Sequence, residues 1–226
     1  ISTMREAAEN GAKVIVFPEL CITAYTCSDL FLQKPLLEGA LRGLEKIRTA
    51  SETLDTTVLV GLPLGIGNML YNCAAVVNRG HIRGIVPKRN IPNYNEFYEL
   101  RHFTEGEAEV RYIEVLGESV PFGSNILFIS SAMPELCIGV ELCEDLWTVD
   151  PPSNSHALAG ATVIANLSAS DELISKAEYR EMLIKSQSAR LYSVYMYADA
   201  GWGESTTDLV FAGDDMICEN GTVLAR

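Results

Sequence analysis

The first third of the chain alternates between amphipathic and continuously apolar stretches. Residues 1–10 carry apolar side chains at helical spacing, and Gly11 ends that pattern, which predicts a helix. The segments "KVIVF" (13–17) and "TTVLVGL" (56–62) are short, unbroken apolar runs. Such runs are typical of strands that are buried on both faces, so we expect two buried strands here.

A second helix is expected between these two strands. Ser28 or Asp29 offers an N-cap for a helical pattern that extends to about Leu54. Pro35 lies inside that pattern and predicts a break, because proline cannot donate the helical hydrogen bond.

The rest of the chain continues the alternation. Two apolar runs flank "NRG" (78–80) and predict a hairpin. Further strands are expected at 124–130, 136–142, 162–166 and 193–199, a helix at 172–192, and an Asn-Gly hairpin at 220–221. No repeat or low-complexity linker divides the chain. The pattern therefore predicts one α/β domain over residues 1–226, with sheets covered by helices.

Composition narrows the class of protein. The chain has 226 residues, 48% hydrophobic and 21% charged, which is enough for a sizeable core. Its formal net charge of −13 argues against nucleic acid as a partner, because phosphates require a basic surface. No apolar run approaches the roughly 18–20 residues of a membrane span, so we expect no membrane association.

Cysteine usage and the chain start point to a cytoplasmic protein. The six cysteines are too few for a disulfide scaffold, and without a C-x-x-C pair or clustered histidines no metal site is expected. The first residues lack the layout of a signal peptide. The chain begins with Ile1 and opens in a helix, which we interpret as a fragment of a longer protein.

Three ionisable residues directly follow apolar strands. Glu19 follows "VIVFP", Lys88 follows "GIVP", and Cys143 follows "CIGVEL". Functional groups of α/β proteins lie at such strand ends. Taken singly, the cysteine is better explained as packing and the glutamate and lysine as surface residues. Taken together, they supply the base, the cation and the nucleophile that thiol acyl chemistry needs.

The setting of Cys143 is unfavourable for a thiolate. Glu141, Glu144 and Asp145 lie within two positions of it, and nearby carboxylates raise the pKa of a thiol. We therefore expect either inert packing or a base and a cation supplied from elsewhere in the chain.

The motifs around these three residues resemble the nitrilase, or carbon–nitrogen hydrolase, superfamily with its Glu–Lys–Cys triad. "VFPEL", "VPKRNIPNY" and "VELCEDLW" stand in the order of its motifs. "KRNIPNYNEFYELRHF" (88–103) and "NLSASDELISKAEYR" (166–180) are similar to segments of one branch, the glutaminase domains of glutamine-dependent NAD synthetases. The resemblance implies an α-β-β-α sandwich of two mixed sheets with helices on the outer faces. It also implies that a first strand precedes this chain.

The resemblance also implies the catalytic roles. Glu19 is expected to remove the proton of Cys143 during attack, so the thiol needs no depressed pKa of its own. Lys88 and the backbone N–H of Glu144 are expected to stabilise the oxyanion. By the same likeness Glu99 orients the lysine, with a surface pair to Arg101 as the alternative.

For the substrate, the glutaminase branch implies L-glutamine. Positions matching Tyr94, Ser170 and Lys176 contact it there, with Lys176 facing the α-carboxylate and Glu144 facing the α-amino group. Each position also has a structural alternative. Tyr94 is then a loop anchor, Ser170 a helix N-cap and Lys176 a helix-surface residue.

The family likeness implies a partner domain as well. Its glutaminases supply ammonia to a synthetase domain that uses ATP and Mg, and no pyrophosphate-loop motif of that domain occurs before Arg226. The glutaminase step itself is expected to need no cofactor, and the protein is expected to be a homo-oligomer. Two other functions remain open from the sequence: a stand-alone amidase or carbamoylase, and a non-catalytic binding domain with Cys143 in its core.

Overall fold

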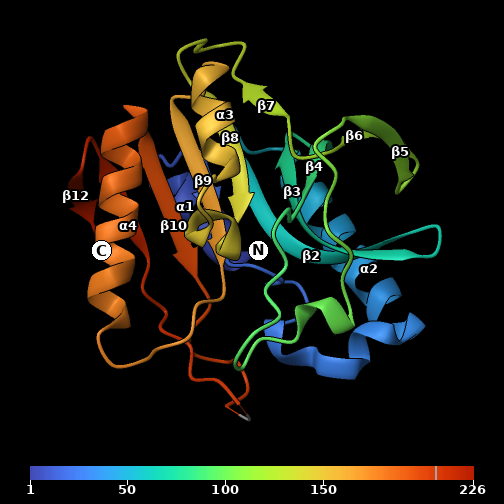
Figure 1. Ribbon diagram of the computed structural model, residues 1–226. Helices are drawn as coiled ribbons and strands as arrows, with labels where there is room; N and C mark the ends of the chain where they lie inside the picture. The colour runs from blue at the N-terminus through green and yellow to red at the C-terminus, as the bar shows by residue number, and fades with distance from the viewer. Residues whose placement is uncertain (207) are drawn as a thin grey trace.

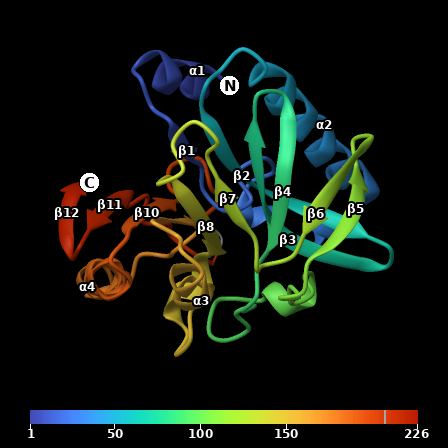
Figure 2. The same cartoon turned by 90° about the horizontal axis from the view of Figure 1, so that it is seen from above.

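Two mixed β-sheets lie face to face at the centre of the molecule, and helices cover their outer surfaces (Figures 1 and 2). The computed structural model describes residues 1–206 and 208–226. In Figure 2, α1 and α2 lie on one side of the paired sheets, and α3 and α4 lie on the other. The predicted α-β-β-α sandwich is confirmed.

Each sheet has six strands in the described part of the chain. The first sheet has the order β1-β2-β3-β4-β6-β5 and the second β12-β11-β10-β9-β8-β7. The strands of the first sheet are β1 (Val14–Val16), β2 (Thr57–Ile66), β3 (Met69–Asn78), β4 (His81–Pro87), β5 (Arg111–Val115) and β6 (Glu118–Phe122). Those of the second are β7 (Leu127–Ile129), β8 (Cys137–Leu142), β9 (Val163–Ser168), β10 (Val194–Asp199), β11 (Met216–Glu219) and β12 (Thr222–Ala225).

The helices divide between the two outer faces. The α-helices are α1 (Ser2–Glu9), α2 (Lys34–Ala50), α3 (Pro152–Leu158) and α4 (Lys176–Leu191), and the 3-10 segments are η1 (Tyr25–Leu32), η2 (Glu99–Arg101) and η3 (Cys143–Trp147). None of the helices that the structure describes combines the length and the apolar character that a membrane crossing requires.

Alternation of side chains along the strands builds three apolar layers. In β2, Val58, Val60 and Leu62 face α1 and α2, whereas Leu59 faces the other sheet. Between the sheets, Leu59 packs in one cluster with residues of β3, β4, β8 and β9. Ile184 of α4 belongs to a third cluster, on the outer face of the second sheet. The continuous apolar runs in the sequence thus reflect strands that are covered on both faces.

The two sheets also meet through their backbone beside the ends of β1 and β9. The N–H of Glu19, just beyond β1, donates to the carbonyl of Ser168 at the end of β9 at 3.2 Å. Strands β8, β9 and β10 run parallel, so their carboxyl ends share that edge. At this edge polar residues follow the apolar strands, and the site described below lies there.

The structure corrects several element assignments. The helix expected from Ser28 or Asp29 to about Leu54 is confirmed over Lys34–Ala50, but its expected start is wrong. Residues 25–32 form η1 instead, in which Ser28 has a φ of 48° that an α-helix does not tolerate. The α-helix begins at Lys34, and Pro35 lies in its first turn, where its missing N–H is not needed. Strands β5 and β6 and helix α3 were not predicted, because their short, polar sequences carry no clear periodicity.

Candidate active site

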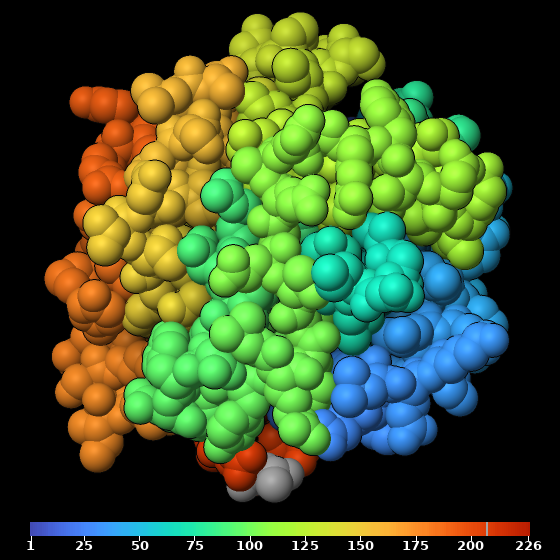
Figure 3. Space-filling view, turned by 45° about the vertical axis from the view of Figure 1, so that its right-hand side comes forward, coloured from blue at the N-terminus to red at the C-terminus, as the bar shows by residue number. Residues whose placement is uncertain are grey.

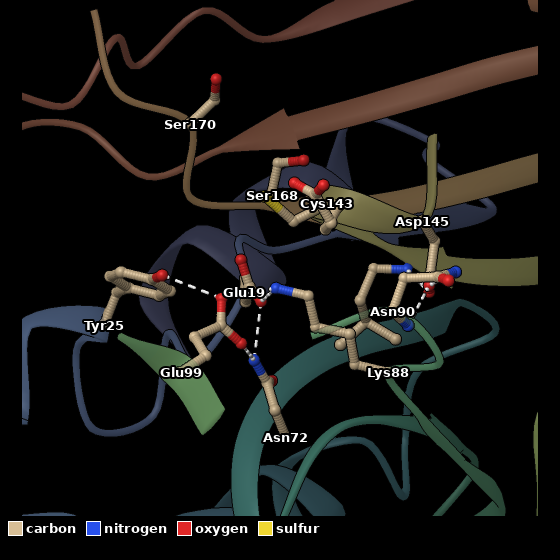
Figure 4. A network of polar contacts seen from close by, with 12 residues as sticks. Glu19, Tyr25, Asn72, Lys88, Asn90, Glu99, Cys143, Asp145, Ser168 and Ser170 are labelled. Atoms are coloured by element: carbon tan, nitrogen blue, oxygen red, sulfur yellow. Dashed lines mark hydrogen bonds and ion pairs between the residues drawn. The ribbon is translucent and has the colours of Figure 1, made fainter. Parts of the chain in front are cut away.

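The three residues that follow apolar strands meet at one edge of the sandwich. Glu19 lies beyond β1, Lys88 directly follows β4, and Cys143 directly follows β8. Glu19 and Lys88 are fully buried, and Cys143 is 6% exposed. Figure 4 shows their side chains gathered in one place, although they come from both sheets.

The Lys88 ammonium lies between two carboxylates. Its Nζ donates to Glu19 Oε1 at 2.7 Å and to Glu99 Oε1 at 2.6 Å. Glu99 is buried in η2, and Arg101 instead pairs with Asp29 at 2.7 Å. The alternative of a surface pair between Glu99 and Arg101 is therefore wrong, and Glu99 contacts the lysine as the family resemblance implied.

Two residues that sequence analysis missed complete this cluster. Asn72 Nδ2 donates to Glu19 Oε1 at 2.6 Å and to Glu99 Oε2 at 3.3 Å, and Tyr25 donates its hydroxyl to Glu99 at 2.9 Å. Asn72 is the one amide in the apolar run "YNCAAVV" of β3. A lone polar side chain in a buried strand must find a partner, and that signal could have identified it.

The backbone at Cys143 turns sharply between β8 and η3. Cys143 has a φ of 41°, which is uncommon for a residue with a Cβ. Its N–H donates to Asn166 Oδ1 at 3.1 Å, and the Ser168 hydroxyl donates to the same oxygen at 2.7 Å. Asn166 and Ser168, both buried in β9, therefore fix the turn that presents the thiol.

The acids that flank Cys143 in sequence all have other partners, and Glu144 accepts from the Tyr94 hydroxyl. Glu141 accepts hydrogen bonds from the Tyr195 hydroxyl and from the Ser153 N–H. Asp145 accepts the N–H groups of Leu142 at 3.0 Å and Asn90 at 2.8 Å, and so connects the segment after Lys88 to the Cys143 turn. The charges that shift the pKa of the thiol most are those of Glu19 and Lys88, which are distant in sequence, and not those of its sequence neighbours.

Burial decides the protonation of the thiol and its nearby carboxylate. Burial, followed by the charge of Glu19, raises the pKa of Cys143 well above its usual value, so the thiol is protonated at neutral pH. Burial raises the pKa of Glu19 to about 7, although Lys88 opposes that shift. Glu19 Oε1 accepts two hydrogen bonds, whereas Oε2 has no partner among the described residues. One basic oxygen is therefore available in a dry pocket.

A cavity of about 330 Å³ opens next to Cys143. That volume is within the range of small-molecule sites. Its lining includes all four predicted substrate residues, Tyr94, Glu144, Ser170 and Lys176. In Figure 3, the green segment after β4, which carries Tyr94, lies on the surface between the gold and orange helices of the second sheet and the blue residues of η1 and α2.

Each of the four lining residues is held by a neighbour. Tyr94 donates to Glu144 at 2.9 Å. Ser170 donates its N–H to Asp199 at 2.6 Å. The Lys176 side chain is only 18% exposed, which excludes the helix-surface alternative. Ser170 is not the N-cap of α4, because that helix starts at Lys176 after Ser175, so the capping alternative is wrong.

The described residues contain no group of three or more His, Cys, Asp or Glu side chains arranged to hold a metal ion. All six cysteines are free thiols. Independence of the hydrolytic step from metals and cofactors stays a prediction.

Comparison with known proteins gives consistent matches. The sequence model of the family described as carbon–nitrogen hydrolase matches residues 1–224. A glutamine-dependent NAD(+) synthetase of Mycobacterium tuberculosis is 45% identical over 222 residues, which are 98% of this chain and 33% of that protein. The chain thus spans about a third of the length of such relatives.

Solved structures agree with the sequence matches. A glutamine-dependent NAD(+) synthetase from Cytophaga hutchinsonii superimposes with a TM-score of 0.88 at 30% identity, covering 100% of this chain and 36% of that one. An amidase of the nitrilase superfamily from Nesterenkonia shares the fold, with a TM-score of 0.74 at 17% identity over 99% of this chain and 78% of that one.

Proposed function

The chain belongs to the carbon–nitrogen hydrolase family, and from that membership we propose that it hydrolyses the side-chain amide of L-glutamine through a thioester on Cys143. The observation that carries this proposal is the position of Cys143 between a buried acid–lysine cluster and a cavity lined by Lys176 and Glu144. The similarity to glutamine-dependent NAD(+) synthetases supports the choice of substrate.

The first half of the proposed reaction forms the thioester. Cys143 Sγ attacks the side-chain amide carbon of glutamine while its proton passes to Glu19. Because the thiol is protonated before attack, a base must act during bond formation, and a carboxylate with a pKa of about 7 suits that task. The tetrahedral intermediate collapses when Glu19 returns the proton to the amide nitrogen, and ammonia leaves.

The second half hydrolyses the thioester. Water attacks the thioester carbon as Glu19 takes its proton, and glutamate leaves as the thiol is reprotonated. In both halves Lys88 and the N–H of Glu144 stabilise the oxyanion that forms on the carbonyl oxygen. Glu99, Asn72 and Tyr25 keep the lysine and the base in position through their hydrogen bonds.

The cavity favours an amino-acid amide over a simple amide. Lys176 supplies a cation for the α-carboxylate, and Glu144 supplies an acid for the α-amino group. A stand-alone amidase or carbamoylase would have the same triad but would need no such pair. A non-catalytic binding domain would not require Glu19, Lys88 and Cys143 to lie together.

We further propose that the ammonia serves a synthetase domain outside this chain. The chain spans about a third of the NAD(+) synthetases it matches, which is consistent with a glutaminase portion. ATP and Mg would then belong to the synthetase portion alone. Cytoplasmic location and a homo-oligomeric state stay predictions.

Lys176→Ala tests the substrate assignment. Lys176 is remote from the scissile amide, so it binds the ground state and the transition state alike, and its loss is expected to raise KM for glutamine more than it lowers kcat. Loss of a charge-assisted contact of about 1.5–3 kcal/mol corresponds to roughly a ten- to hundredfold fall in kcat/KM. Ammonia release from glutamine and from a simple aliphatic amide provides the measurement.

Lys185→Ala, which removes a more exposed lysine of the same helix, is the matched control. Unchanged glutamine kinetics in Lys176→Ala, or a wild-type preference for the simple amide, would replace the glutaminase assignment with a general amidase.

A further inference from the structure

Lys176, which lines the cavity, already has a buried anionic partner, Asp171. It is the one basic residue among the described residues that line the cavity, and its Nζ pairs with the buried carboxylate of Asp171. The same Nζ lies 5.2 Å from the centre of the Trp147 ring and 5.6 Å from that of Phe97. The cation is therefore held by one carboxylate and two aromatic faces.

A second acid, Glu96, contacts this pair. Glu96 also lines the cavity, and its carboxyl hydrogen-bonds with Asp171, a contact that raises the pKa of Glu96. The Oδ1 atom of Asp171 accepts a hydrogen bond from Lys176. Apart from the contact with Glu96, no described group donates a hydrogen bond to its Oδ2 atom. One cation thus faces two acids, and no net positive charge is left to attract a carboxylate.

We propose that Asp171 is a specificity-determining residue that competes with the substrate's α-carboxylate for Lys176. The inference rests on the proposed function, because it takes an amino-acid amide as the substrate. In the free enzyme Asp171 holds the cation against Trp147 and Phe97. On binding, the α-carboxylate takes the place of Asp171 at Nζ, while the aromatic rings keep the ammonium near the cavity.

This competition gives selectivity at a cost in affinity. An amide without a carboxylate cannot displace Asp171, so the ion pair stays closed and the molecule gains nothing from Lys176. A substrate with a carboxylate gains the contact only after the ion pair with Asp171 is broken, which weakens its net binding. If Asp171 only positioned Lys176, removing its charge would weaken glutamine binding. We expect the opposite effect: removing the charge of Asp171 should strengthen glutamine binding.

Asp171→Asn tests this sign, because it keeps the shape and one acceptor oxygen but removes the charge. We expect KM for glutamine to fall roughly three- to tenfold with little change in kcat, since a neutral acceptor holds the ammonium less strongly than a carboxylate. KM for a glutamine derivative whose α-carboxylate is replaced by a carboxamide should not change. Glu178→Gln, which removes an exposed acid two residues from Lys176, is the matched control and should leave both values unchanged.

An unchanged or increased KM for glutamine in a folded Asp171→Asn protein would overturn the proposal, because Asp171 would then only position Lys176. A second measurement does not depend on that variant. Crystal structures of Cys143→Ala protein with and without glutamine should show Nζ on Asp171 when free and on the α-carboxylate when bound. Nζ remaining on Asp171 in the complex would also overturn it. If the wild-type enzyme releases no ammonia from glutamine, the proposed function itself fails; if it does and KM is insensitive to Asp171, only this inference fails.

Discussion

Cys143→Ala is expected to abolish ammonia release from glutamine, with a loss of at least about 10⁴-fold in kcat. The proposed reaction passes through a bond between Sγ and the amide carbon, and alanine offers no atom that can form it. The side chain is small and lies at the edge of a cavity, so the substitution should leave the fold intact. A coupled assay for ammonia, with circular dichroism to compare folding, provides the measurement.

Cys21→Ala and Cys218→Ala are the matched controls. Cys21 is an exposed residue whose thiol contacts the Gly61 carbonyl at 3.7 Å, and it does not line the cavity next to Cys143. Cys218 packs in the cluster beneath α4. Both variants should keep most of the activity. Wild-type turnover in Cys143→Ala would show that the covalent mechanism is wrong.

Glu19→Gln is expected to lower kcat by roughly 10²–10⁴-fold, the contribution of a positioned general base. Glutamine keeps an oxygen that can accept from Lys88 and Asn72, but it cannot take the thiol proton. Glu9→Gln, on the exposed face of α1, serves as the matched control and should retain wild-type rates.

The pH profile separates a base from a merely structural carboxylate. In the proposed mechanism the basic form of Glu19 is the active one. Burial raises the pKa of Glu19 to about 7, so wild-type kcat/KM should rise with pH and level off above about 7. The residual activity of Glu19→Gln should not show that rise. If the variant keeps the same rise between pH 5.5 and 7.5, another group supplies the base.

Much of the fold follows from the apolar runs. Strands β2, β3, β4, β8, β9 and β10 are apolar over most of their length because each is covered on both faces, and that pattern is visible without a structure. Strand β5 is the edge strand of its sheet and β6 is the strand beside it, where less burial is required, so their sequences carry charged and polar residues. Periodicity alone could not identify them.

The residues of the site also differ in whether the sequence alone identifies them. Glu19, Lys88 and Cys143 stand out because ionisable groups directly follow apolar strands, and the likeness to the family gave Glu99. Asn72, Asn166 and Asp171 act through contacts between segments far apart in the chain, such as the 2.6 Å contact from Asn72 to Glu19. The spacing of residues along the sequence does not predict such contacts, so only the structure identifies these residues.

Electrostatics explains why an acidic segment can carry the nucleophile. The sequence places three acids within two positions of Cys143, yet Glu141 and Asp145 bind backbone N–H groups and Tyr195. These contacts stabilise the turn that presents the thiol. In the proposed mechanism the base is Glu19, whose burial raises its pKa to about 7 against the opposing charge of Lys88.

Covalent labelling tests whether Cys143 attacks the side-chain carbon of glutamine. A glutamine analogue in which a chloromethyl ketone replaces the amide would be incubated with the wild-type protein, and the modified peptide identified by mass spectrometry. We expect one adduct, on the peptide that contains Cys143, forming more slowly when glutamine is added and accompanied by loss of activity. An adduct on a different residue, or labelling of Cys143 that leaves glutamine hydrolysis unchanged, would contradict it.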